Sequence, residues 1–256
     1  MSDLQKKAKS RIYFASDFHL GVPDAYASAE RERRIVRWLD RIEENAKEIF
    51  LLGDVFDFWF EYRDVVPKGY VRLLGKLATM ADNGCKIHFV CGNHDLWIRD
   101  YFEKDLGFII HRSAFETVID GKTFLIGHGD GLDFSDRKYM FINRLFKSRF
   151  CVAAFAALHP RWAYAIGKAW SRKSRLSHSE SDKVNLYEQE PIYKYCMAEL
   201  DKRDIDFFVF GHRHLKCDLS LKNGSRYINT GFWATESPYA EWDGENLCLK
   251  NFDLGE

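Results

Sequence analysis

Five short apolar runs recur along the chain, and each ends in a cluster of polar residues. Continuous apolar runs of four to six residues are typical of strands that are buried on both faces. The pattern therefore predicts five buried strands, at residues 11–16, 48–53, 86–92, 123–127 and 206–211. The polar cluster after each run marks the point where the predicted strand ends.

The segments between the first three runs have the period of a helix. Residues 29–45 place Ile35, Trp38 and Ile42 on one face, and residues 69–83 repeat that spacing. A strand, a helix and a further strand in alternation indicate a layered α/β core.

Three turn signals indicate that antiparallel strands accompany these units. Asp120-Gly121, Asn223-Gly224 and Asp243-Gly244 each lie between strand-like residues, as in two-residue hairpin turns. We therefore expect mixed sheets. No internal repeat or low-complexity linker divides the sequence, so we expect a single domain over residues 1–256.

A long stretch between the fourth and fifth predicted strands does not follow this alternation. Its apolar spacing predicts helices at residues 139–149, 151–158, 161–171 and 187–202. One interpretation is a helical cap, inserted at about residues 137–195 over one edge of the core. The alternative is that these helices pack directly on the sheet.

Composition narrows the class of protein. Apolar residues make up 46% and charged residues 30%, which excludes a disordered or low-complexity chain. Six cysteines without C-x-x-C spacing argue against a thiolate zinc site. The longest apolar run, at 150–158, is too short to span a membrane, and the polar residues 1–10 do not resemble a signal peptide. We expect a cytoplasmic protein.

The polar clusters contain the candidate metal ligands and catalytic residues. They contain carboxylates, imidazoles and one amide, at Asp17, His19, Asp54, Asp57, Asn93, His94, Asp95, His128, His212 and His214. Ligands of layered α/β folds bind outside the carboxyl ends of the strands, so we expect these side chains to meet at one rim. Oxygen and nitrogen ligands without thiolate suit Mn, Fe or Zn and, less well, Mg. Two ions about 3.5–4 Å apart would need a bridging ligand such as a carboxylate.

These residues resemble the calcineurin-like metallophosphoesterase superfamily. Its blocks D-x-H, G-D-x-x-D, G-N-H-[DE], a lone His and G-H-x-H occur here in order, at residues 17–19, 53–57, 92–95, 128 and 211–214. The resemblance implies a four-layer sandwich of two mixed sheets flanked by helices. It also implies two divalent ions, with Mn²⁺ the expected metal, that provide hydroxide for attack on phosphorus.

The resemblance further implies a role for each residue. One ion would take Asp17, His19, Asp54 and His214 as ligands. The other would take Asp54, Asn93, His128 and His212, so that Asp54 bridges the pair. His94 would stabilise phosphoryl charge or protonate the leaving group, Asp95 would orient His94, and Asp57 would support the ligands from behind.

A local charge asymmetry bears on the substrate. Residues 137–175 contain ten Lys and Arg, no Asp or Glu, and eight aromatic residues, although the whole chain has 38 basic and 38 acidic residues. Basic and aromatic helices suit an anionic membrane surface or an anionic lipid. They also suit nucleic acid, and the remaining alternative is a solvated basic face over a stripe of core residues.

Within the superfamily, the chain is similar to the UDP-2,3-diacylglucosamine hydrolases of lipid A synthesis. The supporting features are residues 128–139 and the basic, apolar helices that follow them. This resemblance implies hydrolysis of the pyrophosphate of an acylated UDP-sugar, with the acyl chains in the cap. It implies substrate contacts from Asn93, Asp136, Tyr139 and His212. The best-known members of that branch have Arg where this chain has His94.

The branch also implies a place in the cell and leaves alternatives. We expect a peripheral protein on the anionic inner face of the bacterial inner membrane, and no nucleic acid partner. The alternatives are a soluble nucleotide phosphoesterase, such as a dinucleoside polyphosphate hydrolase, a non-catalytic scaffold on the same fold, and a nuclease. The apolar cap argues against the soluble enzyme and the nuclease, and the complete set of ligands argues against the scaffold.

Overall fold

A computed structural model describes residues 9–132, 137–181 and 190–253 of the chain. Its first sheet has six strands in the order β11-β10-β1-β2-β3-β4. The bounds are β1 (Arg11–Ala15), β2 (Ala46–Leu51), β3 (Lys86–Val90), β4 (Ile109–His111), β10 (Pro238–Trp242) and β11 (Leu247–Asn251). β1 to β4 are parallel, and β10 and β11 add an antiparallel hairpin beside β1.

The second sheet has five strands in the order β5-β6-β7-β9-β8. Its strands are β5 (Phe115–Ile119), β6 (Lys122–Ile126), β7 (Phe207–Phe210), β8 (Lys216–Ser220) and β9 (Arg226–Thr230). β6, β7 and β9 are parallel, whereas β5 and β8 pair as antiparallel edge strands. The predicted hairpin turns join β5 to β6 and β10 to β11, and a short 3₁₀ helix (Lys222–Gly224) joins β8 to β9.

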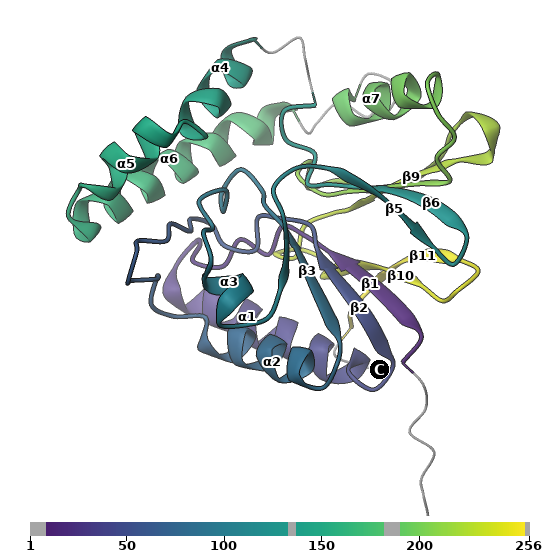
Figure 1. Cartoon of the computed structure of the whole chain (residues 1–256), viewed down its shortest axis with the longest axis horizontal. Coiled ribbons are helices and arrows are strands. Elements are labelled where there is room, and N and C mark those ends of the chain that lie inside the picture. Colours follow the sequence, from purple (N-terminus) through teal and green to yellow (C-terminus); the bar gives the residue numbers. More distant parts are fainter. Residues whose placement is uncertain (1–8, 133–136, 182–189, 254–256) are drawn as a thin grey trace, which may run out of the picture.

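Two layers of helix enclose the two sheets. α1 (Ala25–Ile42) and α2 (Val71–Asp82) cover the outer face of the first sheet, and α7 (Pro191–Leu200) covers the second (Figure 1). Between the sheets, Phe14 and Phe50 of the first pack with Phe124 and Val209 of the second. The four-layer α/β sandwich that the sequence predicts is therefore confirmed.

The N-terminal end of α1 shows how a capping side chain determines where a helix begins. The Asp24 side chain accepts a hydrogen bond from the amide of Ala27 at 2.9 Å and caps the helix, so that α1 begins at Ala25, four residues before the predicted start. Ile35, Trp38 and Ile42 then form the buried stripe that the periodicity predicts. The prediction was wrong at the start of this helix because the apolar stripe begins only at Ile35, about three turns after the cap.

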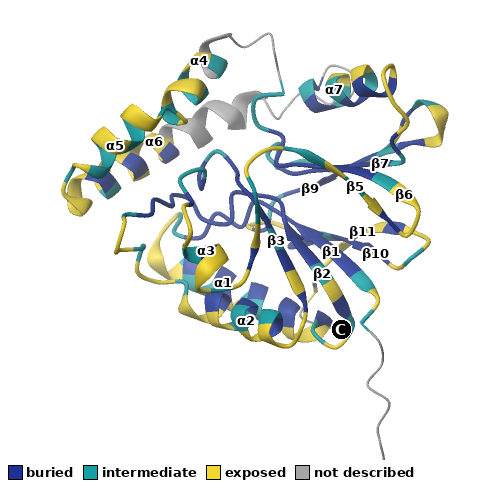
Figure 2. Cartoon of the chain, in the orientation of Figure 1, coloured by how far each residue is buried: buried dark blue, intermediate teal, exposed yellow. Residues whose placement is uncertain are grey.

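Three helices stand apart from the sandwich and are called the cap helices below. α4 (Arg137–Phe146), α5 (Arg149–Ala156) and α6 (Pro160–Ser181) lie at one end of the molecule (Figure 1). Much of their surface is exposed where it can be described, and α5 has no buried residue (Figure 2). In the described stretches, none of the helices is both long and apolar enough to cross a membrane.

The predicted helices of the insertion are confirmed, with different bounds and a different place for the last. α6 continues ten residues beyond the predicted end at Ser171. α7 does not join the cap, since Ile192 and Cys196 pack on Phe208 and Phe210 of the second sheet. A short helix, α3 (Tyr101–Lys104), precedes β4.

Candidate metal centre

The polar clusters that follow β1, β2, β3, β6 and β7 meet at one end of the two sheets. They place possible ligand atoms within 4.8 Å of one another in three groups, which are Asp17–His19–His214, His19–Asp54–His94 and Asp54–His128–His212. His19 and Asp54 each belong to two groups. The groups are therefore contiguous, as two neighbouring metal positions require.

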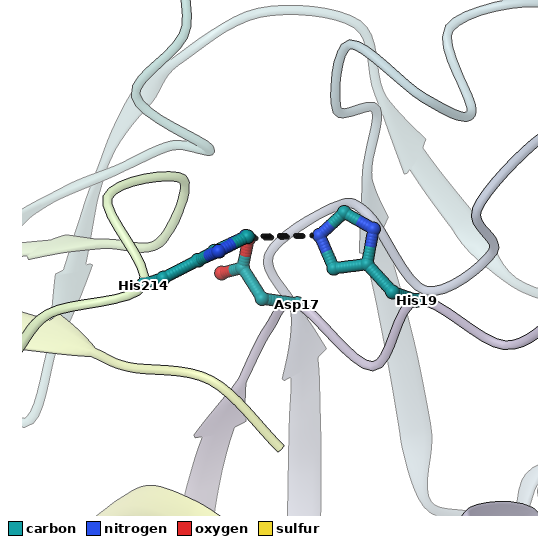
Figure 3. A group of neighbouring side chains, drawn as sticks. All are labelled: Asp17, His19 and His214. Carbon is teal, nitrogen blue, oxygen red and sulfur yellow. Dashed lines mark hydrogen bonds and ion pairs between the residues drawn. The ribbon is translucent and has the colours of Figure 1, made fainter. Parts of the chain in front are cut away.

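The first group joins the ends of β1 and β7 (Figure 3). Asp17 Oδ1 lies 3.3 Å from His214 Nε2 and 3.7 Å from His19 Nε2, and the two imidazole nitrogens are 3.0 Å apart. Asp17 Oδ1 is buried and has no hydrogen-bond partner among the described residues. A buried carboxylate oxygen that faces two imidazole nitrogens fits a divalent cation, because such an oxygen needs a partner.

The second group is built around Asp54. Its Oδ2 lies 3.3 Å from His128 Nε2 and 3.6 Å from His19 Nε2, so it faces both halves of the centre. His128 Nδ1 donates to the carbonyl of Leu52 at 2.7 Å, which directs Nε2 inward. Asn93 Oδ1 lies 3.1 Å from that same Nε2. These atoms also fit a divalent cation.

The backbone at this centre is held in a conformation that side chains rarely adopt. Asp17, His19, Asp54, His212 and His214 all have positive φ angles, between 41° and 70°. Non-glycine residues in this region cost free energy and persist where the surroundings over-determine them. Five such residues in one rim indicate a functional site.

Charge in the centre follows from burial and from the close carboxylates. Burial alone would raise the pKa of Asp54, but the imidazoles of His128 and His94 outweigh it and hold that pKa well below its usual value. Burial opposes protonation of His128, yet the charges of Asp54 and Asp17 raise the pKa of His128 well above its usual value. The ionised carboxylate of Asp54 therefore lies beside the imidazoles of the centre.

Asp95 lies between the two loops that follow β2 and β3, beside the candidate metal centre. Its carboxylate is fully buried and accepts hydrogen bonds from the amides of Gly92 and Val55, at 2.7 and 2.8 Å. Burial and the Asp54 charge raise the pKa of Asp95 to about 7. These contacts tie the loop after β3 to the loop after β2, so Asp95 holds the two ligand-bearing loops together.

His94 is buried beside the groups. Its Nδ1 lies 2.9 Å from the Asp57 carbonyl and 3.0 Å from Ser171 Oγ, and its Nε2 lies 3.9 Å from Asp54 Oδ2. Burial lowers the pKa of His94 to about 4. Among the described residues, the hydrogen-bond partners of the His94 side chain are the Asp57 carbonyl and the Ser171 hydroxyl, so the predicted orientation of His94 by Asp95 is not seen. Sequence reasoning missed Ser171, for which no motif gives a signal.

An apolar pocket of about 550 Å³ lies between the cap helices and the loops of the core. Phe58 and Trp97 form its core side, and Phe155, Leu158 and Ile166 form part of its cap side. Its size is that of a small-molecule site, and its lining is almost wholly apolar. Sequence reasoning anticipated an acyl site among the aromatic residues of the cap, which include Phe155, but did not anticipate the core side formed by Phe58 and Trp97.

The remaining residues predicted for the site are Asp57, His212, Asp136 and Tyr139. Asp57 Oδ1 lies 3.6 Å from His19 Nδ1, on the side of that ring away from Asp54. His212 donates its backbone amide to Asp17 Oδ2 at 3.0 Å. Asp136 and the side chain of Tyr139 lie outside the described residues, so their predicted contacts with substrate stay predictions.

The sequence matches a family that carries this kind of centre. Residues 10–216 match the calcineurin-like phosphoesterase family, and the chain belongs to it. The resemblance on which the sequence analysis relied is confirmed. The members of this family are hydrolases that use divalent metal ions, in keeping with the His and Asp groups described above.

Two relatives with curated names are both UDP-2,3-diacylglucosamine hydrolases. The chain is 39% identical to the UDP-2,3-diacylglucosamine hydrolase of Porphyromonas gingivalis over 96% of this chain and 98% of the relative. It is 25% identical to the enzyme of that name from Edwardsiella ictaluri, over 92% and 90%. Among solved structures, the phosphoesterase Yfce of E. coli has a TM-score of 0.44 at 17% identity and covers 93% of this chain and 90% of that one.

Proposed function

We propose that the protein hydrolyses UDP-2,3-diacylglucosamine to 2,3-diacylglucosamine 1-phosphate and UMP, a step of lipid A biosynthesis. Water adds to one phosphorus of the pyrophosphate, and the bond to the bridging oxygen breaks. The relative in Porphyromonas gingivalis, aligned over nearly the whole chain, supports this substrate. The observation that carries the proposal is the apolar pocket, which lies beside a centre suited to phosphoester hydrolysis.

The metal ligands in this proposal are those of the first and third groups, with Asn93 added and Asp54 shared. One ion would be held by Asp17, His19, Asp54 and His214, and the other by Asp54, Asn93, His128 and His212. Mn²⁺ is the metal that we propose, because oxygen and imidazole ligands without thiolate suit it. When bound, the pair of ions supplies a nucleophile at neutral pH and neutralises charge on the phosphoryl group.

The other residues position the reacting groups. His94 is buried and its Nε2 points toward Asp54, so it faces the place where a phosphoryl oxygen must sit. An imidazole whose Nε2 faces the phosphate would accept a proton there and, once protonated, would donate it or stabilise the charge of the phosphoryl oxygens. Asn93 and His212 reach both a metal and the substrate. Asp57 Oδ1 lies near Nδ1 of His19 and would hold that ring in place. Asp136 and Tyr139 are proposed as further substrate contacts.

The apolar pocket would hold the acyl chains. Each methylene that leaves water contributes about 0.8 kcal/mol, and part of that free energy can hold the pyrophosphate in line for attack. A soluble dinucleotide has no group to fill this pocket. The pocket therefore favours the lipid substrate over the soluble-nucleotide alternative.

The exposed side of the cap suits an anionic membrane surface. Phe150 is 88% exposed and Trp162 is 65% exposed, and exposed Arg149, Arg161 and Lys168 accompany them. Exposed aromatic side chains with basic neighbours are typical of helices that lie on anionic lipid. We propose that the protein binds peripherally to the inner face of the inner membrane, where the substrate resides.

Product analysis tests the proposal. Protein freed of metal with a chelator is incubated with UDP-2,3-diacylglucosamine in detergent, with and without Mn²⁺. We expect UMP and 2,3-diacylglucosamine 1-phosphate only when Mn²⁺ is present. Rapid cleavage of dinucleoside polyphosphates, with none of the acylated sugar nucleotide, would instead support the soluble-nucleotide alternative.

A further inference from the structure

The cap helix α6 meets the core along a seam. The Tyr164 hydroxyl donates to the carbonyl of Phe60 at 2.8 Å. One turn later, Gly167 lies so close to the Phe58 ring that a Cβ at that position would overlap the ring. These two contacts fix the register of α6 on the loop that follows β2 and Asp54.

One further turn along α6, Ser171 reaches the metal centre. Ser171 is buried, and its hydroxyl donates to Asp57 Oδ2 at 2.7 Å. His94 Nδ1 lies 3.0 Å from the same hydroxyl oxygen and 2.9 Å from the Asp57 carbonyl. Because a carboxylate and a carbonyl only accept, the Ser171 proton points to Asp57 and the His94 proton sits on Nδ1.

This arrangement links one hydroxyl of the cap to both sides of the centre. With its proton on Nδ1, His94 presents a bare Nε2 toward Asp54 Oδ2, 3.9 Å away. The second carboxylate oxygen of Asp57 lies 3.6 Å from His19 Nδ1. Ser171 thus acts on His94 directly and on the ligand His19 through Asp57.

We propose that Ser171 is a positioning residue. Through Ser171, the packing of α6 against the core determines the orientation of the His94 side chain. The idea rests on the proposed function, in which the apolar pocket holds acyl chains. Gly167 and Trp170 of α6 line that pocket, directly before Ser171 in the helix. An acyl chain in the pocket packs against this turn and stabilises the seam, whereas an unacylated nucleotide leaves the turn unsupported. The serine thereby makes the geometry of His94 depend on the lipid part of the substrate.

The test compares Ser171→Ala and the near-isosteric Ser171→Cys with Ser171→Thr, which keeps the hydroxyl. Loss of this hydrogen bond lowers kcat by roughly ten-fold, with KM within about two-fold, and threonine restores most of the rate. Ser225 provides the matched control, since it is also buried and donates to the Ile205 carbonyl at 2.6 Å, away from the centre. Ser225→Ala keeps the wild-type kcat.

A second readout needs neither metal nor turnover. In metal-free protein with ¹⁵N-labelled histidine, the Nδ1 proton of His94 gives an NMR signal that exchanges slowly with water. We expect faster exchange in Ser171→Ala and Ser171→Cys, and slow exchange in Ser171→Thr and Ser225→Ala. If one variant fails to fold, the other hydroxyl-free variant carries the same prediction.

The result that would overturn this inference is a wild-type kcat together with a slowly exchanging His94 proton in either hydroxyl-free variant. The kinetic arm is run on UDP-2,3-diacylglucosamine and on bis(p-nitrophenyl) phosphate. If the wild-type enzyme cleaves only the second compound, the proposed substrate fails. The role of Ser171 is still decided by that compound and by proton exchange.

Discussion

At the scale of the residue, the centre depends on one carboxylate that two loops hold in place. Asp54 Oδ1 accepts the amide of His94 at 2.9 Å, while Oδ2 faces His19 and His128. Gly92 permits this approach, because a Cβ there would overlap the Asp54 carboxylate. In the proposed function, Asp54 and His94 have separable roles: Asp54 would hold metal, and His94 would act on the phosphate.

Substitution of these two residues separates the roles. We expect Asp54→Ala to lose bound metal and all measurable turnover, since its carboxylate faces both metal positions. We expect His94→Ala to keep about two ions per chain and to lose rate by roughly 10²- to 10⁴-fold, if the imidazole takes part in proton transfer. Elemental analysis beside steady-state kinetics measures both effects. Loss of the ions from His94→Ala would show that His94 is itself a ligand.

A second prediction concerns His111, the last residue of the edge strand β4. Its Nε2 lies 3.0 Å from His88 Nδ1. Burial, followed by the charge of His88, lowers the pKa of His111 to about 4 from 6.5. The unfolded chain therefore binds a proton more readily than the folded one, and the stability due to His111 is complete above pH 6.5 and declines toward pH 4.

Urea unfolding of His111→Gln at pH 7 and pH 5 measures this contribution. The wild-type protein should lose more unfolding free energy over that interval than the variant, because glutamine does not titrate. His159 is exposed and provides the control, so His159→Gln should follow the wild type. Equal losses in the wild type and His111→Gln would contradict the assignment.

At the scale of the element, sequence patterns predicted the strands that precede the polar clusters and the clustering of Asp and His residues at their ends, but not the contacts of the cap. Asp17 and His19 were predictable because their chemical types stand directly after a buried apolar run. Ser171 was not predictable, since its contact with Asp57 spans 114 positions and depends on the register of α6. α7 was misplaced for the same kind of reason, because its period shows an apolar face but not which surface covers it.

The pocket under α6 gives a prediction at this scale. Ile166 lines the pocket, whereas its neighbour Ala165 is exposed and does not line it. We expect Ile166→Glu to raise KM for the acylated substrate at least about ten-fold, because a carboxylate is costly beside buried methylenes. Ala165→Glu adds the same charge to the same helix and should leave KM unchanged. Equal KM values for the two variants would show that acyl chains do not enter this pocket.

At the scale of the whole molecule, charge is distributed unevenly. The stretch 137–175 holds ten Lys and Arg without an acidic residue in a chain whose totals balance. The cap helices form one end of the molecule, so their charge is concentrated there (Figure 1). This end can face a membrane while the sandwich remains in solution.

Vesicle sedimentation tests that orientation. The protein should bind anionic vesicles more than neutral ones, and less at high salt, since each basic residue near the surface contributes up to about 1 kcal/mol. The double variant Arg149→Glu and Arg161→Glu should weaken binding. Lys202→Glu, at the remote end of α7, should not. Equal binding to neutral and anionic vesicles would remove the electrostatic argument.

The identity of the substrate is the central claim, and one ratio of kinetic constants tests it most directly. It is kcat/KM for UDP-2,3-diacylglucosamine divided by kcat/KM for UDP-N-acetylglucosamine, measured with Mn²⁺ under the same detergent conditions. The two compounds present the same pyrophosphate to the metals and differ in the acyl chains that the pocket would hold. We predict a ratio of at least about 10³, because burial of even six methylenes contributes more than the free energy which that ratio requires. A ratio near one would show that the apolar pocket makes no contribution to catalysis, and would contradict the proposed function.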